Sequence, residues 1–282
     1  MQSSLTQPAP ALGAPALAPA RIIHVAPDGT RVDEALQYMS EAARRVLGHA
    51  DFVEIIQLSR RGGLALVRQD GELKVFKVIN CQADWKKRAA RRVGWNPARH
   101  ARKVSGQLGR AGIPICAVEQ HGSVNLRGAP RAVWTLSTYI PNGRTLRQIK
   151  LETQPGDRAP SHGNVVRLFE ESLQLLRRLH DAGFEHRDYH AGNLLVSPAD
   201  AENLQAGRGS IRLVDLETVV MRKATLVRRA RDLRRFLENF TERGSGAVLR
   251  SALATYAGAD EALVARILAT RRMQGLVRKL GL

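Results

Sequence analysis

The spacing of the apolar residues changes once along the chain, and this change limits the possible folds more than any other feature. Three segments, 52–59, 63–69 and 73–79, are short and rich in Leu, Val, Ile and Phe, and are separated by the turns SRRGG and QDGE. This pattern predicts three consecutive antiparallel strands. Residues 164–180 instead place apolar side chains at helical spacing, and we expect this helix to end at Gly183. The sequence therefore predicts an α+β fold in which an antiparallel sheet precedes the helices.

Further segments extend both halves of this pattern. We expect helices at 33–47, after Pro97 and after the turn at 141–146, strands at 112–122, 131–140 and 194–196, a short strand within 211–220 that ends in Asp215 behind a tight hairpin, and helical segments at 223–240 and 245–279. The change near 137–143 predicts two lobes with a cleft between them, a sheet-rich N-lobe at 21–140 and a mainly helical C-lobe at 141–282. Residues 1–20, rich in Pro and Ala, are expected to form a disordered tail.

The charge of the chain indicates an anionic partner. A formal net charge of +18 favours nucleic acid, nucleotides, phosphorylated sugars or an acidic membrane surface. Aromatic residues make up only 5%, and no groove-reading motif is present, so we expect no specific nucleic acid partner. Cys81 and Cys116 cannot build a disulfide framework, and the chain shows no run of about 18 apolar residues and no signal-peptide pattern. A cytoplasmic location follows, including the inner face of the cytoplasmic membrane.

Two segments concentrate the positive charge. Residues 85–110 contain nine Lys or Arg. Residues 222–240 combine an apolar stripe at helical spacing with Arg228, Arg229, Arg231, Arg234 and Arg235. Such faces suit the phosphates of a glycolipid or an anionic inner leaflet. A solvated helix face in an arginine-rich chain explains the same charges equally well.

The segment FEHRDYHAGNLLV, residues 184–196, carries most of the chemistry. His186 and His190 are spaced for one helical face, which suggests a zinc site, but Gly192 favours a loop and a third ligand is missing. A polar loop of structural histidines is the second alternative. Phosphoryl transfer explains the spacing better, because it needs a carboxylate to orient the attacking hydroxyl and oxygen ligands for magnesium. Asp188 supplies the first, and Asn193 with the later Asp215 supplies the second.

A cation for the nucleotide phosphates is expected on a strand of the first lobe. Alternation within 73–79 puts Lys77 on one face with Val75 and Ile79, inside an apolar run where a lysine is costly unless it is paired. Lys74 lies near the strand start and is expected to reach water. Lys77 is therefore the better candidate, and a lysine that only extends to solvent from an edge strand is the alternative.

These motifs together resemble a known family. LLRRLHDAGFEHRDYHAGNLLV, with RLVDLETVV after it and VFKVI before it, is similar to the lipopolysaccharide core kinases of the Kdo/heptose (WaaP-type) family, a branch of the protein-kinase-like fold. The resemblance covers about residues 52–240. It implies ATP and Mg²⁺ as cofactors and a nucleotide-binding N-lobe.

The same resemblance assigns roles to individual residues. Asp188 becomes the catalytic base, braced by His186 and Arg187, and Asn193 and Asp215 become the magnesium ligands. Lys77 becomes the phosphate-binding lysine. The remaining nucleotide contacts are the hairpin over the phosphates, Arg60, Arg61, Gly62 and Gly63, and the hinge at the adenine, Ser137 with Thr138, Tyr139 and Ile140.

The sequence departs from the kinase pattern in several places. There is no G-x-G-x-x-G, and the motif at Asp215 is D-L-E. The helix glutamate that pairs with the strand lysine is missing, and His100 stands about where it is expected. Asp84 or Glu119 are then the candidate partners of Lys77, or the lysine is positioned differently.

The predicted function is ATP-dependent transfer of the γ-phosphoryl group to a sugar hydroxyl, heptose or Kdo, of the lipopolysaccharide inner core. The short chain after Asp215 disfavours a peptide acceptor, because it leaves little room for a peptide-binding helical subdomain. Two alternatives remain open: a kinase-like phosphotransferase with a protein or small-molecule acceptor, and a non-catalytic kinase-like binding protein.

Overall fold

The computed structural model describes residues 21–22, 39, 51–59, 61–81, 95–126, 129–152, 161–197, 211–241 and 246–281. Three predictions fall outside these ranges. They are the disordered tail at 1–20, the basic segment at 85–94, and the helix at 33–47 apart from Met39, which is helical and buried.

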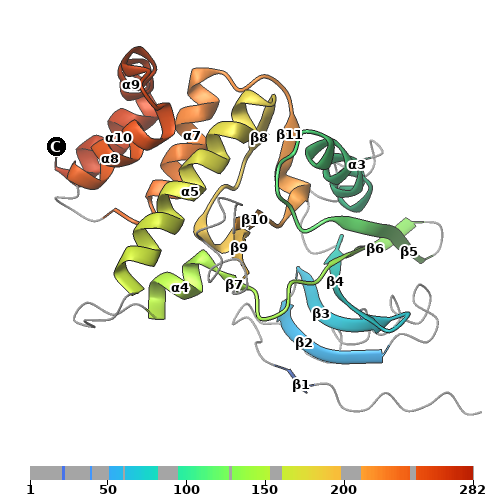
Figure 1. Cartoon of the computed structure of the whole chain (residues 1–282). Coiled ribbons are helices and arrows are strands. Elements are labelled where there is room, and N and C mark those ends of the chain that lie inside the picture. The colour runs from blue at the N-terminus through green and yellow to red at the C-terminus, as the bar shows by residue number, and fades with distance from the viewer. Residues whose placement is uncertain are drawn as a thin grey trace, which may run out of the picture.

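The first half of the described chain forms a six-stranded sheet (Figure 1). Its strands are β1 (Arg21–Ile22), β2 (Asp51–Ser59), β3 (Gly62–Gln69), β4 (Glu72–Asn80), β5 (Val118–Leu126) and β6 (Ala129–Thr138). They lie in the order β1-β2-β3-β4-β6-β5, and every neighbouring pair is antiparallel except β1 with β2. The predicted three-strand meander is confirmed as β2, β3 and β4. Asp70 and Gly71 close its second turn with positive φ angles of 51° and 81°, the conformation that tight hairpins favour.

The strand predicted at 112–122 begins later than expected. β5 starts at Val118, and before it Ile115 forms only an isolated bridge to Leu213. The Cys116 amide donates to the Leu213 carbonyl at 2.9 Å. The backbone groups of this segment thus bond to the second half of the chain, which is why the apolar run does not extend the sheet.

Helix α3 (Pro97–Arg110) lies between the sheet and the second half of the chain (Figure 1). Asn96 begins it, because its side-chain oxygen accepts from the amides of Ala98 and Arg99 at 3.0 and 3.1 Å. The helix packs on β5 and β6 and also on residues 216–221. The helix predicted after Pro97 is confirmed, and it connects the two halves.

The second half is mainly helical. Its helices are α4 (Leu146–Glu152), α5 (Ser161–Asp181), α7 (Leu226–Leu237), α8 (Gly246–Ala257), α9 (Glu261–Leu268) and α10 (Arg271–Leu280). The prediction of one helical segment at 245–279 is wrong, because the chain turns twice there. Gly258 has a φ of 64°, which ends α8, and the side chains of Asp260 and Thr270 cap the next two helices.

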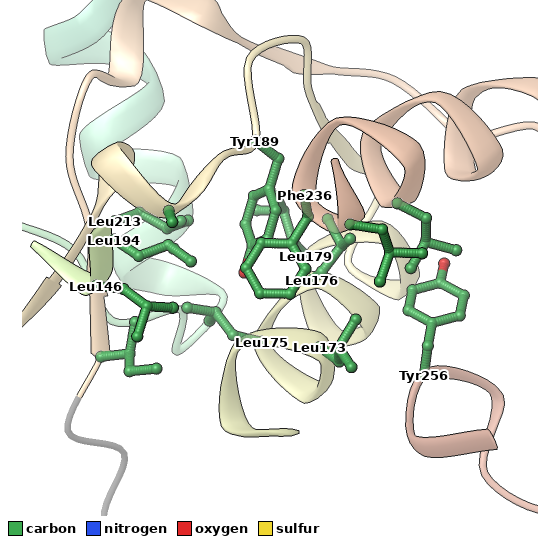
Figure 2. Close-up of a cluster of buried hydrophobic side chains, with 14 of the residues drawn as sticks. Leu146, Leu173, Leu175, Leu176, Leu179, Tyr189, Leu194, Leu213, Phe236 and Tyr256 are labelled. Carbon is green, nitrogen blue, oxygen red and sulfur yellow. The ribbon is translucent and has the colours of Figure 1, made fainter. Parts of the chain in front are cut away.

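These helices enclose the main apolar core (Figure 2). Leu173, Leu176 and Leu179 of α5 lie near Phe236 of α7, and all four are buried. The apolar stripe predicted within 222–240 belongs to the same cluster. Its function is therefore to pack α7 into the core.

Short strands position the loops between the helices. They are β7 (Arg144–Thr145), β8 (Phe184–His186), β9 (Leu194–Val196), β10 (Ile211–Leu213) and β11 (Val219–Met221). β8 pairs with β11, while β9 pairs with both β7 and β10. Two expectations are corrected here: the strand within 211–220 ends at Leu213 and not at Asp215, and 14 residues separate it from β9, more than a tight hairpin has.

An antiparallel N-terminal sheet followed by a helical C-terminal part defines a two-lobed, α+β, protein-kinase-like fold. The boundary between the lobes at 140/141 remains a prediction. None of the helices within the described ranges is long and apolar enough to span a membrane.

Candidate active site

The loop that carries Asp188 is anchored by the residue that follows it. Tyr189 is fully buried among Phe236 and the leucines of α5 (Figure 2), and its hydroxyl donates to the Ser172 carbonyl at 2.6 Å. An aromatic ring buried in this way fixes the loop in place. Asp188, next to it, is thereby directed away from the core, and its side chain is 32% exposed.

Hydrogen bonds within the loop set its shape. The Asp188 amide donates to His186 Nδ1 at 3.3 Å, and Asn193 Nδ2 donates to the Asp188 carbonyl at 2.9 Å. Burial lowers the pKa of His186, although Asp232, Asp215 and Asp188 oppose this effect. A neutral imidazole can accept at Nδ1, as this bond requires. His186 therefore contacts the loop backbone.

The Asp188 carboxylate has two neighbours that were not predicted. Arg235 of α7 donates to Asp188 Oδ1 from Nε at 3.0 Å and from Nη2 at 2.8 Å. His190 Nε2 lies 3.4 Å from the other carboxylate oxygen. One oxygen is thus held by a guanidinium, and the other faces an imidazole.

Asp215 lies beside this loop in a left-handed conformation. Its φ and ψ are 62° and 46°, and the Thr218 hydroxyl donates to its carbonyl at 3.0 Å. Few non-glycine residues adopt such angles. The preceding residue joins the two loops, because the Val214 amide donates to the Asn193 carbonyl at 3.1 Å. Asp188, Asn193 and Asp215 therefore belong to one hydrogen-bonded unit.

Lys77 reaches this unit from the sheet. Its Nζ contacts carboxylate oxygens of both Asp215 and Glu217. The expected alternative partner Glu119 is wrong for Lys77, because it pairs with Lys74 at 2.9 Å, and Asp84 lies outside the described residues. Lys74 pairs with Glu72 at 2.6 Å, and the side chains of the two residues are 15% and 71% exposed.

The three charges alter one another's protonation. Burial lowers the pKa of Lys77, but Glu217 and Asp215 outweigh burial and raise it. Burial raises the pKa of Asp215, but Lys77 outweighs it and brings the pKa to about 2. For Glu217, burial and the neighbouring Asp215 raise the pKa against the opposing effect of Lys77. Asp215 is therefore the more firmly ionised of the two acids.

The predicted phosphate-covering hairpin lies at the Lys77 end of the sheet. Gly62 and Gly63 pair with Ile79 and Val78 of β4, one step beyond the pair that Lys77 forms. Gly62 has a φ of 143°, and a Cβ there would lie 1.9 Å from the Val78 carbonyl oxygen, so only glycine fits. Arg61 is exposed in the turn, and its carbonyl accepts from the Asn80 amide at 2.8 Å. Arg60 is not among the described residues.

The predicted hinge links the sheet to the helical half. Thr138 is the last residue of β6, where its amide donates to the Ala117 carbonyl at 2.9 Å and its hydroxyl to Glu119 at 3.1 Å. Tyr139 and Ile140 follow the strand and are half-buried. Since both donors of Thr138 are engaged within the sheet, the two later residues are the better placed for a ligand.

Arg187 points away from Asp188 and toward a buried glutamate. Glu185 is fully buried, and its carboxylate lies 3.3 Å from Arg187, 2.8 Å from Arg222, and 3.2 Å from both Arg228 and Arg231. Burial raises the pKa of Glu185, but the arginines, Arg222 foremost, outweigh it and lower the pKa to about 2. Four guanidinium groups thus surround one carboxylate directly behind the loop.

The arginines of α7 are paired within the chain. The pairs are Arg228 with Glu185, Arg229 with Asp181, Arg231 with Asp232, Arg234 with Glu238, and Arg235 with Asp188. The expectation that they form an anion-binding face is therefore not supported. Exposed cations are instead present on α3, at Arg99, Arg102, Lys103 and Arg110.

A zinc site at the two histidines lacks ligands. Within the described ranges no three His, Cys, Asp or Glu side chains are grouped to hold a metal ion. His190 Nδ1 instead accepts from the Gly192 amide at 3.0 Å, which makes that ring part of the loop structure.

The donors for magnesium fit better. Mg²⁺ bound with a nucleotide needs only one or two protein oxygens, because phosphates and water supply the others. Asn193 Nδ2 is used within the loop, which leaves the amide oxygen as the ligand atom. Asp215 and Glu217 together carry one negative charge more than Lys77 balances. The oxygen donors and the surplus charge both suit a hard divalent cation.

Three residues of the site were missed in the sequence. Glu217 is the acid of the D-L-E motif. The sequence shows this acid, but it does not show the turn that brings Glu217 beside Asp215. Arg235 had the pattern of a solvent-facing arginine. Glu185 stands between Phe184 and the polar run that begins at His186, where no sequence signal shows that it is buried.

Comparisons with known proteins add little beyond the fold. No family model matches the chain, and no curated protein matches it. Among solved structures it is similar to WaaP in complex with acyl carrier protein, with 18% identity and a TM-score of 0.49 over 76% of this chain and 85% of that chain. The roles of the residues are therefore inferred from this chain itself.

Proposed function

We propose that this chain is an ATP-dependent phosphotransferase that uses Asp188, Asn193, Asp215 and Lys77. The observation that carries the proposal is that Lys77, from the sheet, contacts Asp215, which shares one hydrogen-bonded unit with Asn193 and Asp188. These groups are far apart in sequence and have the charges that phosphoryl transfer requires.

Each residue has a distinct task in this proposal. Lys77 binds nucleotide phosphates, while Asn193 and Asp215 hold Mg²⁺, which neutralises charge on the transferring group when bound. Asp188 orients the acceptor hydroxyl and accepts its proton. His186 and Arg187 position the Asp188 loop. Catalysis is then mainly a matter of positioning and charge.

The nucleotide is proposed to lie between hairpin and hinge. Arg61, Gly62 and Gly63 cover the phosphates, and the adenine meets the hinge at Thr138, Tyr139 and Ile140. Of the hinge residues, the last two make the direct contacts, because the Thr138 donors are engaged within the sheet.

The acceptor is proposed to be a sugar hydroxyl, heptose or Kdo, of the lipopolysaccharide inner core. Support comes from the resemblance of the catalytic motifs to the Kdo/heptose kinase family and from the excess of positive charge. The exposed cations of α3 suit an anionic membrane surface at which such a glycolipid is met.

The non-catalytic alternative loses its main argument. It rested on the missing helix glutamate, but Lys77 has acidic partners in Asp215 and Glu217. A phosphotransferase with another acceptor remains the rival interpretation.

The test is transfer of labelled γ-phosphate from ATP, with Mg²⁺, to lipopolysaccharide from a strain that lacks this gene. We expect label in the glycolipid with the wild type, and a loss of about 10³-fold with Asp188→Asn. Equal transfer by both proteins would contradict the proposed base. Absence of label in lipid together with Mg²⁺-dependent ATP binding would move the proposal to another acceptor.

A further inference from the structure

The acidic partner of Lys77 comes from an unexpected element. Helix α3 packs beside the site but contains no Asp or Glu between Pro97 and Arg110. Its His100 does not face a lysine: Nε2 lies 2.7 Å from the Val219 carbonyl oxygen. The helix therefore holds the backbone that follows Glu217 and supplies no carboxylate of its own.

The turn at 215–218 brings two acids to one lysine. Asp215 begins the turn in the left-handed conformation, and Glu217 follows two residues later. Both carboxylates contact Lys77. Leu216 and Val219 are buried in the main core on either side of Glu217. The position of Glu217 is thus fixed by packing, in the way that a precise contact requires.

The two acids differ in their other neighbours. The Val214 amide, next to Asp215, donates to the Asn193 carbonyl at 3.1 Å, so the backbone at Asp215 is bonded to the proposed magnesium ligand. Glu217 contacts the same Lys77 ammonium, and its side chain is only 18% exposed. If Asp215 binds a metal ion, Glu217 can keep its contact with Lys77.

We propose that Glu217 is the positioning residue for Lys77, that it replaces the glutamate absent from α3, and that it retains the lysine when Asp215 binds the metal. This inference rests on the proposed function. It makes D-L-E a functional motif in which the first acid serves the metal and the second serves the lysine.

A double-mutant cycle on MgATP affinity tests the inference. The dissociation constant is measured by calorimetry for the wild type, Glu217→Gln, Lys77→Met and the double variant. Loss of a charge-assisted contact predicts about tenfold weaker binding in Glu217→Gln. Because Glu217 acts through Lys77, the same substitution in Lys77→Met should change affinity by less than about twofold.

Controls separate a positioning role from a structural one. Glu72→Gln removes another carboxylate from a lysine on β4, where Glu72 is 2.6 Å from Lys74 and its side chain is 71% exposed, and it should leave MgATP affinity unchanged. Glu217→Asp, measured alongside, keeps the charge and should restore part of the lost affinity. Circular dichroism spectra verify that each variant is folded.

The outcomes are distinct. A tenfold effect that persists in Lys77→Met would overturn the inference and favour Glu217 as a direct metal ligand. Unchanged affinity in Glu217→Gln would overturn it while the proposed function stands. Absence of MgATP binding by the folded wild type would overturn both.

Discussion

Two clusters of charge in this protein have opposite compositions. At Lys77, one cation meets two carboxylates, whereas at Glu185 one carboxylate meets four arginines. The first cluster joins the sheet to the catalytic loop and leaves a surplus negative charge, which suits a bound cation. The second lies behind the loop, is closed around a fully buried acid, and joins β8 to α7 and to the segment after β11. The comparison suggests that the first cluster serves ligand binding and the second serves stability.

The largest expected effect concerns the second cluster. Glu185→Ala removes a fully buried carboxylate that four arginines share, and we expect the free energy of unfolding to fall by about 3 kcal/mol, because breaking a buried ion pair is strongly destabilising. Urea denaturation measures this loss. The matched control is Glu238→Gln, which removes the partner of Arg234 at the surface and should cost less than about 1 kcal/mol. An equal loss in free energy of unfolding in the two variants would contradict a special stabilising role for the Glu185 cluster.

The next effect concerns the first cluster. Lys77→Met removes the cation that meets the nucleotide phosphates, and we expect kcat for phosphoryl transfer to fall about 100-fold. The free energy of unfolding should change much less than in Glu185→Ala. Steady-state kinetics and urea denaturation on the same preparation check both statements. A stability loss as large as that of Glu185→Ala would show that the lysine serves the fold.

The pH dependence of stability should also report on the charge of Glu185. The pKa of Glu185 in the folded protein is about 2, below its usual value, because Arg222 and Arg231 outweigh the opposing effect of burial. A depressed folded-state pKa contributes stability above the unfolded pKa that is lost as the pH falls through the folded value. We therefore expect stability to fall between about pH 5 and pH 2. Thermal unfolding of the wild type and Glu185→Gln checks this, since the variant should lack that part of the loss.

The smallest expected effect belongs to the ion pair at the catalytic base. Arg235 and Asp188 have side chains that are 54% and 32% exposed, so Arg235→Ala should lower the free energy of unfolding by less than about 1 kcal/mol. Urea denaturation measures the change. A loss in free energy of unfolding as large as that of Glu185→Ala would show that the Arg235–Asp188 pair stabilises the fold.

Much of the fold was predictable from local pattern. Short apolar segments bounded by turn residues located β2, β3 and β4, and helical spacing with Gly183 located α5. The failures occurred where long-range contacts decide the conformation. The backbone of residues 114–116 bonds to Leu213 and so does not extend β5, and Asp215 adopts a left-handed conformation that no periodicity reveals.

The candidate site was predictable in its residue types but not in its pairing. The spacing of Asp188, Asn193 and Asp215 identified the chemistry. Partners were not predictable, because Glu217 and Arg235 reach the site through turns and helix packing. Sequence reasoning treated Arg235 as a surface charge, since an amphipathic pattern does not show which carboxylate lies opposite.

The most direct measurement is the affinity for ATP with and without Mg²⁺, in the wild type and in Asp215→Asn. The account predicts that Mg²⁺ tightens ATP binding in the wild type by about tenfold or more, and that the variant loses most of this gain because it lacks the ionised ligand. Equal affinities with and without Mg²⁺ in the wild type, or the same gain in Asp215→Asn, would contradict the claim that the Lys77 cluster is a metal-dependent phosphotransferase site.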